Sequence, residues 1–173
     1  LIKERAFLIV LITILVTIWF RKGLILGSGE SGLPFYNTQR LLYTVAHTWS
    51  DTPLGGTSAI GYASYPFYLF ISFFQHLGVP SFLLQAFVYW FIFVVGTLSI
   101  HRLSSNISDN TFLSRISSSL FYIFNPIVHV AVLHRFQYPL IVFYGFIPLA
   151  FLIYLTGQRS KKFLPAVIVS FLG

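Results

Sequence analysis

Long apolar runs separated by short polar segments dominate this chain of 173 residues. The runs cover residues 6–26, 81–101, 112–132 and 140–157, and another begins at 163 and continues to the last residue. A helix needs about 20 predominantly apolar residues to cross the hydrocarbon core of a bilayer. The pattern therefore predicts an all-α fold, a polytopic transmembrane helical bundle that takes up the whole of 1–173 as a single domain.

The segment 27–80 differs from these runs and predicts a long external loop. Glycine and proline recur through it and mark turns. Between 37 and 50, apolar side chains recur at helical spacing, which predicts a short amphipathic helix on the membrane surface. The run 65–77 is short for a crossing, so we expect an interfacial or re-entrant helix there.

Composition supports a membrane protein and argues against several other classes. The chain is 56% hydrophobic and 9% charged, whereas a soluble domain carries about 25% charged residues. The formal net charge is +7, but the basic residues stand mostly at the ends of apolar runs, where they anchor helices. We therefore predict contact with membrane lipids and no nucleic acid partner. Cysteine is absent, which excludes disulfides and thiolate metal sites within the chain.

Lysine and arginine also predict the orientation, because cytoplasmic segments carry an excess of them. With a cytoplasmic N-terminus and a non-spanning 65–77, seven of these residues lie inside and four outside. The protein is then a multi-pass protein of the cell (plasma) membrane, with the loop 27–80 external. The chain runs from Leu1 to Gly173 and stops within an apolar run, so we interpret it as part of a longer protein.

Two acidic residues of the external loop are candidates for chemistry. Glu30 lies in GSGESGLPFY, directly after the first run, and Asp51 lies in WSDTPLGG. A carboxylate at the membrane surface can act as a general base and take a proton from an attacking hydroxyl. An ordinary turn residue is the alternative for both. Of the other two acids, Glu4 is interpreted as a solvated flanking residue between Lys3 and Arg5, and Asp109 as a solvated residue of a short polar turn.

If the hydroxyl attacks a sugar carbon, the leaving group would be a lipid phosphate. Its negative charge would need cations or hydrogen-bond donors beside it. The external candidates are Arg40, His134, Arg135 and Gln137. Arginine suits phosphate because its planar fork can bind two oxygens, although anchoring to lipid headgroups is an alternative for each arginine. His129 and His134 are five residues apart and do not share a helix face, so no metal site is predicted.

The order of these features resembles the N-terminal part of GT-C membrane glycosyltransferases, especially the arabinofuranosyltransferase-like proteins. The resemblance covers about 5–157 and is carried by GESGLPFYN, TWSDTPLGG, GYASYPFYLFISFFQHLGVPSF and FYIFNPIV. It implies inverting transfer of a sugar from a polyprenyl-phosphate donor at the outer membrane face. Glu30 would be the catalytic base and Asp51 a supporting or second acid. Many relatives have Gly-Asp where this chain has Gly29-Glu30.

The resemblance implies no organic cofactor and leaves a divalent metal open. The acceptor could be a glycan, a lipid or a protein. Two other classes compete with this reading. A transporter or flippase would show broken helices and ionisable residues near the membrane midplane. A membrane subunit without chemistry would tolerate replacement of Glu30.

Overall fold

The computed structural model describes residues 1–25, 33–46, 65–107, 111–126 and 138–160. Within these ranges 87% of the residues are helical and no strand occurs. The predicted all-α class is therefore confirmed. Beyond that, the fifth predicted run, from 163 onward, lies outside the described residues.

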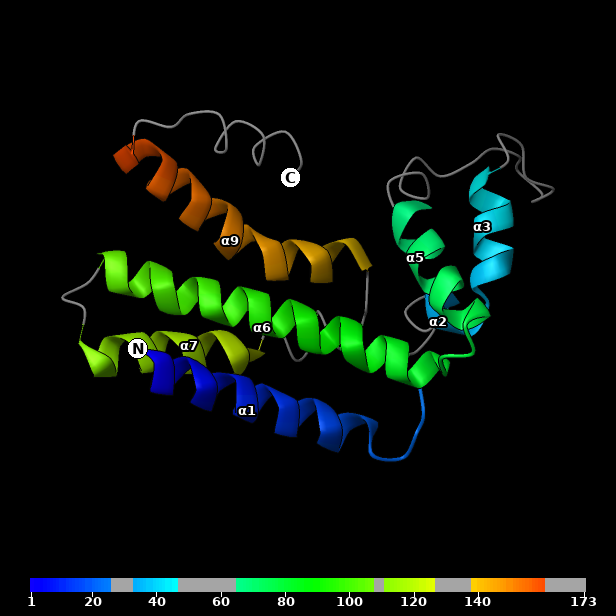
Figure 1. Cartoon of the computed structure of the whole chain (residues 1–173), viewed down its shortest axis with the longest axis horizontal. Coiled ribbons are helices and arrows are strands. Elements are labelled where there is room, and N and C mark those ends of the chain that lie inside the picture. The colour runs from blue at the N-terminus through cyan, green and yellow to red at the C-terminus, as the bar shows by residue number, and fades with distance from the viewer. Residues whose placement is uncertain (26–32, 47–64, 108–110, 127–137, 161–173) are drawn as a thin grey trace.

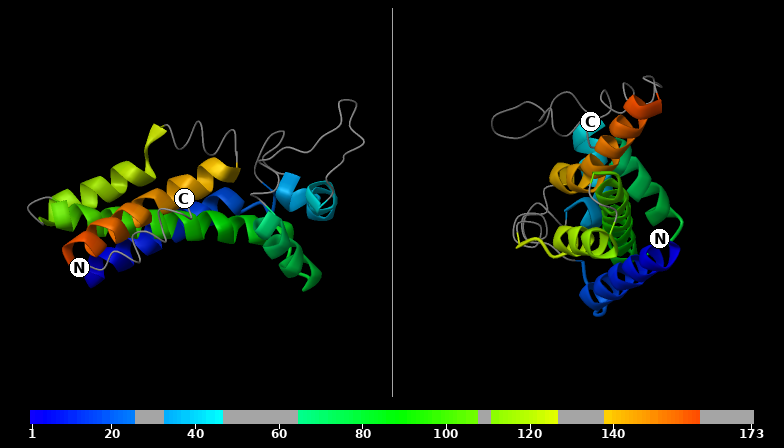
Figure 2. Two further views of the ribbon diagram at one scale, coloured as in Figure 1. Left: turned by 90° about the horizontal axis from the view of Figure 1, so that it is seen from above. Right: turned by 90° about the vertical axis from the view of Figure 1, so that its left-hand side faces the viewer.

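The long helix α6 (Ser81–Ile107) is the centre of the main bundle, where it contacts the other three long helices. Helices α1 (Ile2–Phe20) and α7 (Phe112–Ile123) run in one direction, whereas α6 and α9 (Tyr138–Ser160) run in the other (Figure 1). Seen end-on, the three partners lie around α6 (Figure 2, right). Helix α6 begins at the predicted residue 81, but it continues six residues beyond the predicted end at 101.

Helix α1 packs on α6 through one face with a four-residue repeat. Its buried residues are Leu8, Ile12, Val16 and Phe20. This spacing keeps the side chains on one side of a helix. A polar contact joins the same two helices, because the indole N–H of Trp90 donates to Thr13 Oγ1 at 2.9 Å.

The predicted single helix over 6–26 is wrong at its C-terminal end. Helix α1 ends at Phe20, and Arg21 and Lys22 form a turn. Gly23 then adopts a φ of +66°, in the left-handed region that glycine enters without steric cost, and its N–H donates to the Phe20 carbonyl at 2.9 Å. Leu24 and Ile25 therefore do not extend the helix.

Helices α7 and α9 approach α6 closely at small residues. The rings of Tyr122 and Tyr144 stack with centroids 4.4 Å apart and planes 10° apart. The Tyr122 ring lies directly over Gly96 of α6, and Gly145 of α9 faces Ile92. Helix α7 ends at Ile123, shortly before the Asn-Pro pair at 125–126, as the helix-breaking property of proline predicts. The rest of the predicted run to 132 lies outside the described residues.

Three shorter helices form a separate group at the end of the bundle where α6 begins (Figure 1; Figure 2, left). They are α2 (Leu33–Tyr36), α3 (Thr38–Ala46) and α5 (Tyr65–His76), and we call them the head. Phe35 is fully buried and packs edge-on against Phe67, with ring centroids 6.0 Å apart. The predicted helices within 37–50 and 65–77 are confirmed as α3 and α5. Their position at a membrane surface stays a prediction.

The outer faces of the bundle expose rows of large apolar side chains at helical spacing. On α1, four such residues are 51–56% exposed. Similar rows occur on α6 and α9. The exposed residues are Phe7, Val10, Ile14 and Ile18 on α1, Leu83, Phe87 and Phe91 on α6, and Ile147, Phe151 and Tyr154 on α9. Among the described helices, α6 alone is both long and apolar enough to qualify as a membrane span by itself.

Candidate functional site

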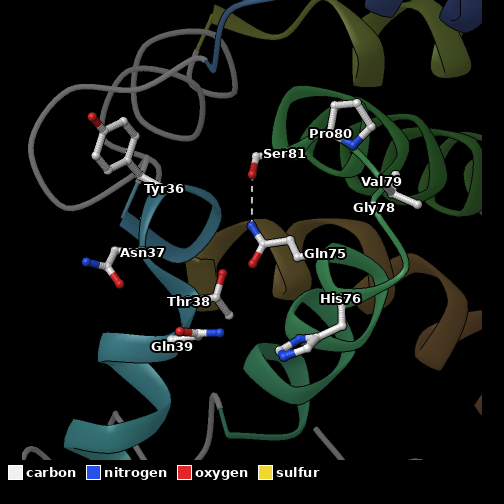
Figure 3. A pocket seen from close by; sticks show the side chains of 10 residues that line it. All are labelled: Tyr36, Asn37, Thr38, Gln39, Gln75, His76, Gly78, Val79, Pro80 and Ser81. Carbon is white, nitrogen blue, oxygen red and sulfur yellow. Dashed lines mark hydrogen bonds between the residues drawn. The ribbon is translucent and has the colours of Figure 1, made fainter.

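A polar cavity opens between the head and the start of α6 (Figure 3). Its volume is about 470 Å³. Helices α2, α3 and α5 and the turn before α6 all contribute to its wall. Polar lining residues are Asn37, Thr38, Gln39, Gln75, His76 and Ser81. Amide, imidazole and hydroxyl groups of this kind suit a ligand rich in hydroxyl groups, since each can donate or accept a hydrogen bond.

Gln75 connects the segments that line this cavity through hydrogen bonds. Its Nε2 donates to the Phe35 carbonyl at 2.9 Å and to Ser81 Oγ at 2.8 Å. One side chain on α5 therefore joins α2 to the first turn of α6. Both amide hydrogens are used in these contacts, so the carbonyl oxygen Oε1 is the part of Gln75 that can accept a bond from a ligand.

His76 presents one ring nitrogen for binding. Its Nδ1 lies 2.8 Å from the Ser72 carbonyl oxygen. Because a carbonyl can only accept, Nδ1 carries the hydrogen and Nε2 is left as an acceptor in the neutral ring. Figure 3 shows the ring on the side of the cavity that faces Thr38 and Gln39 of α3. His76 can thus accept a hydrogen bond from a hydroxyl in the cavity.

Asn37 positions the opposite wall. It precedes α3, and its Oδ1 accepts a hydrogen bond from the Arg40 backbone N–H at 3.2 Å. This contact is that of an N-cap residue, which satisfies an otherwise unpaired donor in the first helical turn. The same residue lines the cavity, so the capping contact fixes the start of α3 beside it.

Of the six site residues predicted from sequence, Arg40 lies in the described part of the chain. It is on α3 with an exposed side chain, in the helix that forms one wall of the cavity, but it does not itself line the cavity. The others are outside the described residues: Glu30, Asp51, His134, Arg135 and Gln137. Sequence reasoning missed Gln75 and His76 because both end an apolar run, and a polar pair there is also typical of an ordinary helix end.

A second constellation joins three helices at the other end of the bundle. The Glu4 carboxylate accepts two hydrogen bonds from Arg115, 2.8 Å from Nε to Oε2 and 2.7 Å from Nη2 to Oε1. His101 Nε2 lies 2.8 Å from Glu4 Oε2, so it donates to the carboxylate. These contacts connect α1, α6 and α7, and the His101 side chain is fully buried.

The interpretation of Glu4 as a solvated flanking residue is therefore wrong. Its side chain is 11% exposed and belongs to a bidentate ion pair. The hydrogen bond from Arg115 lowers the pKa of the Glu4 carboxyl to about 2, against the opposite effect of partial desolvation. Glu4 stays ionised at neutral pH, and the cluster acts as an electrostatic clamp between helices. Its partners are 97 and 111 residues away in sequence, so no local pattern could reveal it.

Comparisons with protein-family models, with curated proteins and with solved structures found no match.

Proposed function

We propose that this chain is a multi-pass membrane protein whose head lies at the outer membrane face and takes part in transfer of a sugar from a polyprenyl-phosphate donor. The observation that carries the proposal is the polar cavity between the head and the start of α6. Membrane embedding and sugar transfer are supported by different observations.

The exposed apolar rows support membrane embedding. Soluble monomers rarely expose contiguous apolar patches of more than a few hundred Å². Here α1 is apolar on its outer face as well as on the face that packs against α6. A helix that is apolar all round belongs in a protein core or in a membrane. Lipid is the partner that would cover the outward rows of α1, α6 and α9 together.

The arrangement of the helices supports one membrane face for the head. Helix α1 leads towards the head, and α6 leads away from it, so the intervening residues 21–80 begin and end at the same end of the bundle. Helix α5 has 12 residues, which is too few to cross a bilayer. It exposes Leu69, Phe70 and Phe73, a composition that suits a helix lying in the membrane interface.

Sugar transfer is supported by what surrounds the cavity in sequence. The described walls at 33–46 and 65–81 flank the segments that carry Glu30 and Asp51. The walls supply neutral groups for binding hydroxyls, whereas the reaction also requires a base. In the proposed step, an acceptor hydroxyl attacks the anomeric carbon and Glu30 takes its proton. The new C–O bond forms as the bond to the lipid phosphate breaks, and polyprenyl phosphate leaves with inversion at the carbon.

The test is sugar transfer by the full-length protein in membranes. Wild type is compared with Glu30→Gln for transfer of labelled sugar from a panel of polyprenyl-phosphate sugars. Loss of the base should reduce the rate by about 10²–10⁴-fold. Asp109→Asn is the matched control, because it also removes one carboxylate, from a link predicted to be cytoplasmic, and should leave transfer unchanged.

Each outcome of this test separates the competing functions. A folded but inactive Glu30→Gln with an active control supports the proposal. An active Glu30→Gln keeps the enzyme class but removes Glu30 as the base. Absence of transfer by wild type from every donor would favour the transporter or the non-catalytic subunit.

A further inference from the structure

A second cavity is lined by residues of α1, α6 and α9. These parts of the three helices lie at the end of the bundle remote from the head (Figure 1). The volume of the cavity is about 520 Å³. The wall consists of Arg5 from α1, Leu98, Ser99 and Arg102 from α6, and Leu152 from α9. It is separate from the polar cavity of the head and plays no part in the proposed transfer.

The cavity has two positive charges that no carboxylate pairs with in the described part of the chain. Arg5 and Arg102 both line it, and within the described ranges neither forms an ion pair with a carboxylate. Glu4, which neighbours Arg5 in sequence, already binds Arg115 and His101. The two guanidinium groups make a site for an anion with several oxygens, which arginine binds through paired N–H groups.

The walls of the cavity also suit an apolar group attached to that anion. Leu98 and Leu152 line the same cavity as the arginines. Phe151, the neighbour of Leu152, is 48% exposed, and Phe7, two residues after Arg5, is 54% exposed. A ligand with its phosphate at the arginines would therefore find apolar side chains beside it. Along α6, the cavity lies where the apolar stretch gives way to His101 and Arg102.

We propose that this cavity binds the phosphate headgroup of an anionic phospholipid, with the acyl chains against the apolar faces of α1 and α9. The proposal rests on the membrane embedding argued above, but not on sugar transfer. Under the predicted orientation this end faces the cytoplasm, where the membrane surface is negatively charged. The bound lipid would fasten α1, α6 and α9 to one another beside the Glu4 clamp.

The test measures lipid binding to the full-length protein in detergent by native mass spectrometry. The probes are phosphatidylglycerol, phosphatidylcholine and glycerol phosphate, which separate an anionic lipid from a zwitterionic lipid and from a soluble phosphate. Each arginine near an anionic headgroup accounts for about a fivefold gain in affinity, so Arg5→Gln or Arg102→Gln should weaken phosphatidylglycerol binding about fivefold. The double variant should weaken it about 30-fold.

The chain offers a matched control in Arg21 and Lys22, two exposed cations at the other end of α1. Replacing both by glutamine removes the same charge and should leave phosphatidylglycerol binding at the wild-type level. Far-UV circular dichroism and gel filtration show whether each variant is folded. If the double variant is not folded, the two single variants test the role of the arginines in phosphatidylglycerol binding.

The proposal is overturned by any of four results. These are equal binding of phosphatidylcholine and phosphatidylglycerol, saturation of the site by glycerol phosphate alone, wild-type affinity in folded Arg5 and Arg102 variants, or an equal loss in the control. Because no sugar donor is used, failure here leaves the proposed transfer untouched, and failure of transfer leaves this site untouched.

Discussion

Replacing Gly96 by alanine tests the packing of the bundle at its tightest point. A Cβ at Gly96 would lie 2.7 Å from Cζ and 2.8 Å from Cε1 of Tyr122. Carbon atoms in favourable contact are about 3.5–4.0 Å apart, so the ring must move by nearly 1 Å. It cannot move without disturbing its stacking on Tyr144, 4.4 Å away.

The expected cost combines three effects. Overpacking a well-packed interface costs about 1–3 kcal/mol, and partial loss of the ring stack adds about 1 kcal/mol. Alanine recovers about 1 kcal/mol because it is a better helix former than glycine. The net loss in unfolding free energy is therefore about 2 kcal/mol. For a chain of this size, this lowers the midpoint of thermal unfolding by about 4–8 °C.

The assay is thermal unfolding in mild detergent, with tryptophan fluorescence as the readout. The same substitution is also made in a Tyr122→Ala background, where the obstructing ring is gone. There Gly96→Ala should cost nothing or stabilise slightly, so the two sites should show strong coupling. An unchanged or raised midpoint for Gly96→Ala alone, or an equal cost in both backgrounds, would refute the proposed contact between α6 and α7.

Further predictions concern the clamp and the head. The folded-state pKa of Glu4 is lowered to about 2 from 4.5, so its stabilising effect is complete above pH 4.5 and disappears as pH falls towards 2. The difference in thermal midpoint between wild type and Glu4→Gln should shrink over that interval, and a constant difference would contradict the pairing. Asn37→Ala should cost about 1 kcal/mol and speed hydrogen exchange in α3 but not in α9. His76→Ala should raise the KM for sugar transfer several-fold with little change in kcat, whereas Tyr43→Phe, outside the cavity, should change neither.

The helices of the bundle were largely predictable from sequence, because length and apolar character are local properties. The predicted runs correspond to α1, α6, α7 and α9. The predicted C-terminal end of the first helix was wrong because Leu24 and Ile25 are apolar and favour continuation of the helix. The deciding feature was the backbone conformation of Gly23, which a hydrophobicity pattern does not contain.

The sites were less predictable, because they depend on contacts between distant segments. Glu4 has only basic neighbours in sequence, whereas its partners come from α6 and α7. Gln75 contacts Phe35, which is 40 residues away. Predicted catalytic roles for Glu30 and Asp51 stay predictions, since both lie outside the described residues.

Cysteine accessibility in intact cells tests the central claim most directly, that the bundle spans the membrane with the head outside. The chain contains no cysteine, so single cysteines can be introduced at exposed positions without background labelling from this chain. Tyr36 in the head is 82% exposed, Ile107 at the opposite end of α6 is 65% exposed, and Phe87 lies in the apolar row. A membrane-impermeant maleimide should label Tyr36→Cys in intact cells, label Ile107→Cys only after permeabilisation, and leave Phe87→Cys unlabelled in both. Labelling of Tyr36→Cys and Ile107→Cys from the same side, or ready labelling of Phe87→Cys, would contradict the account.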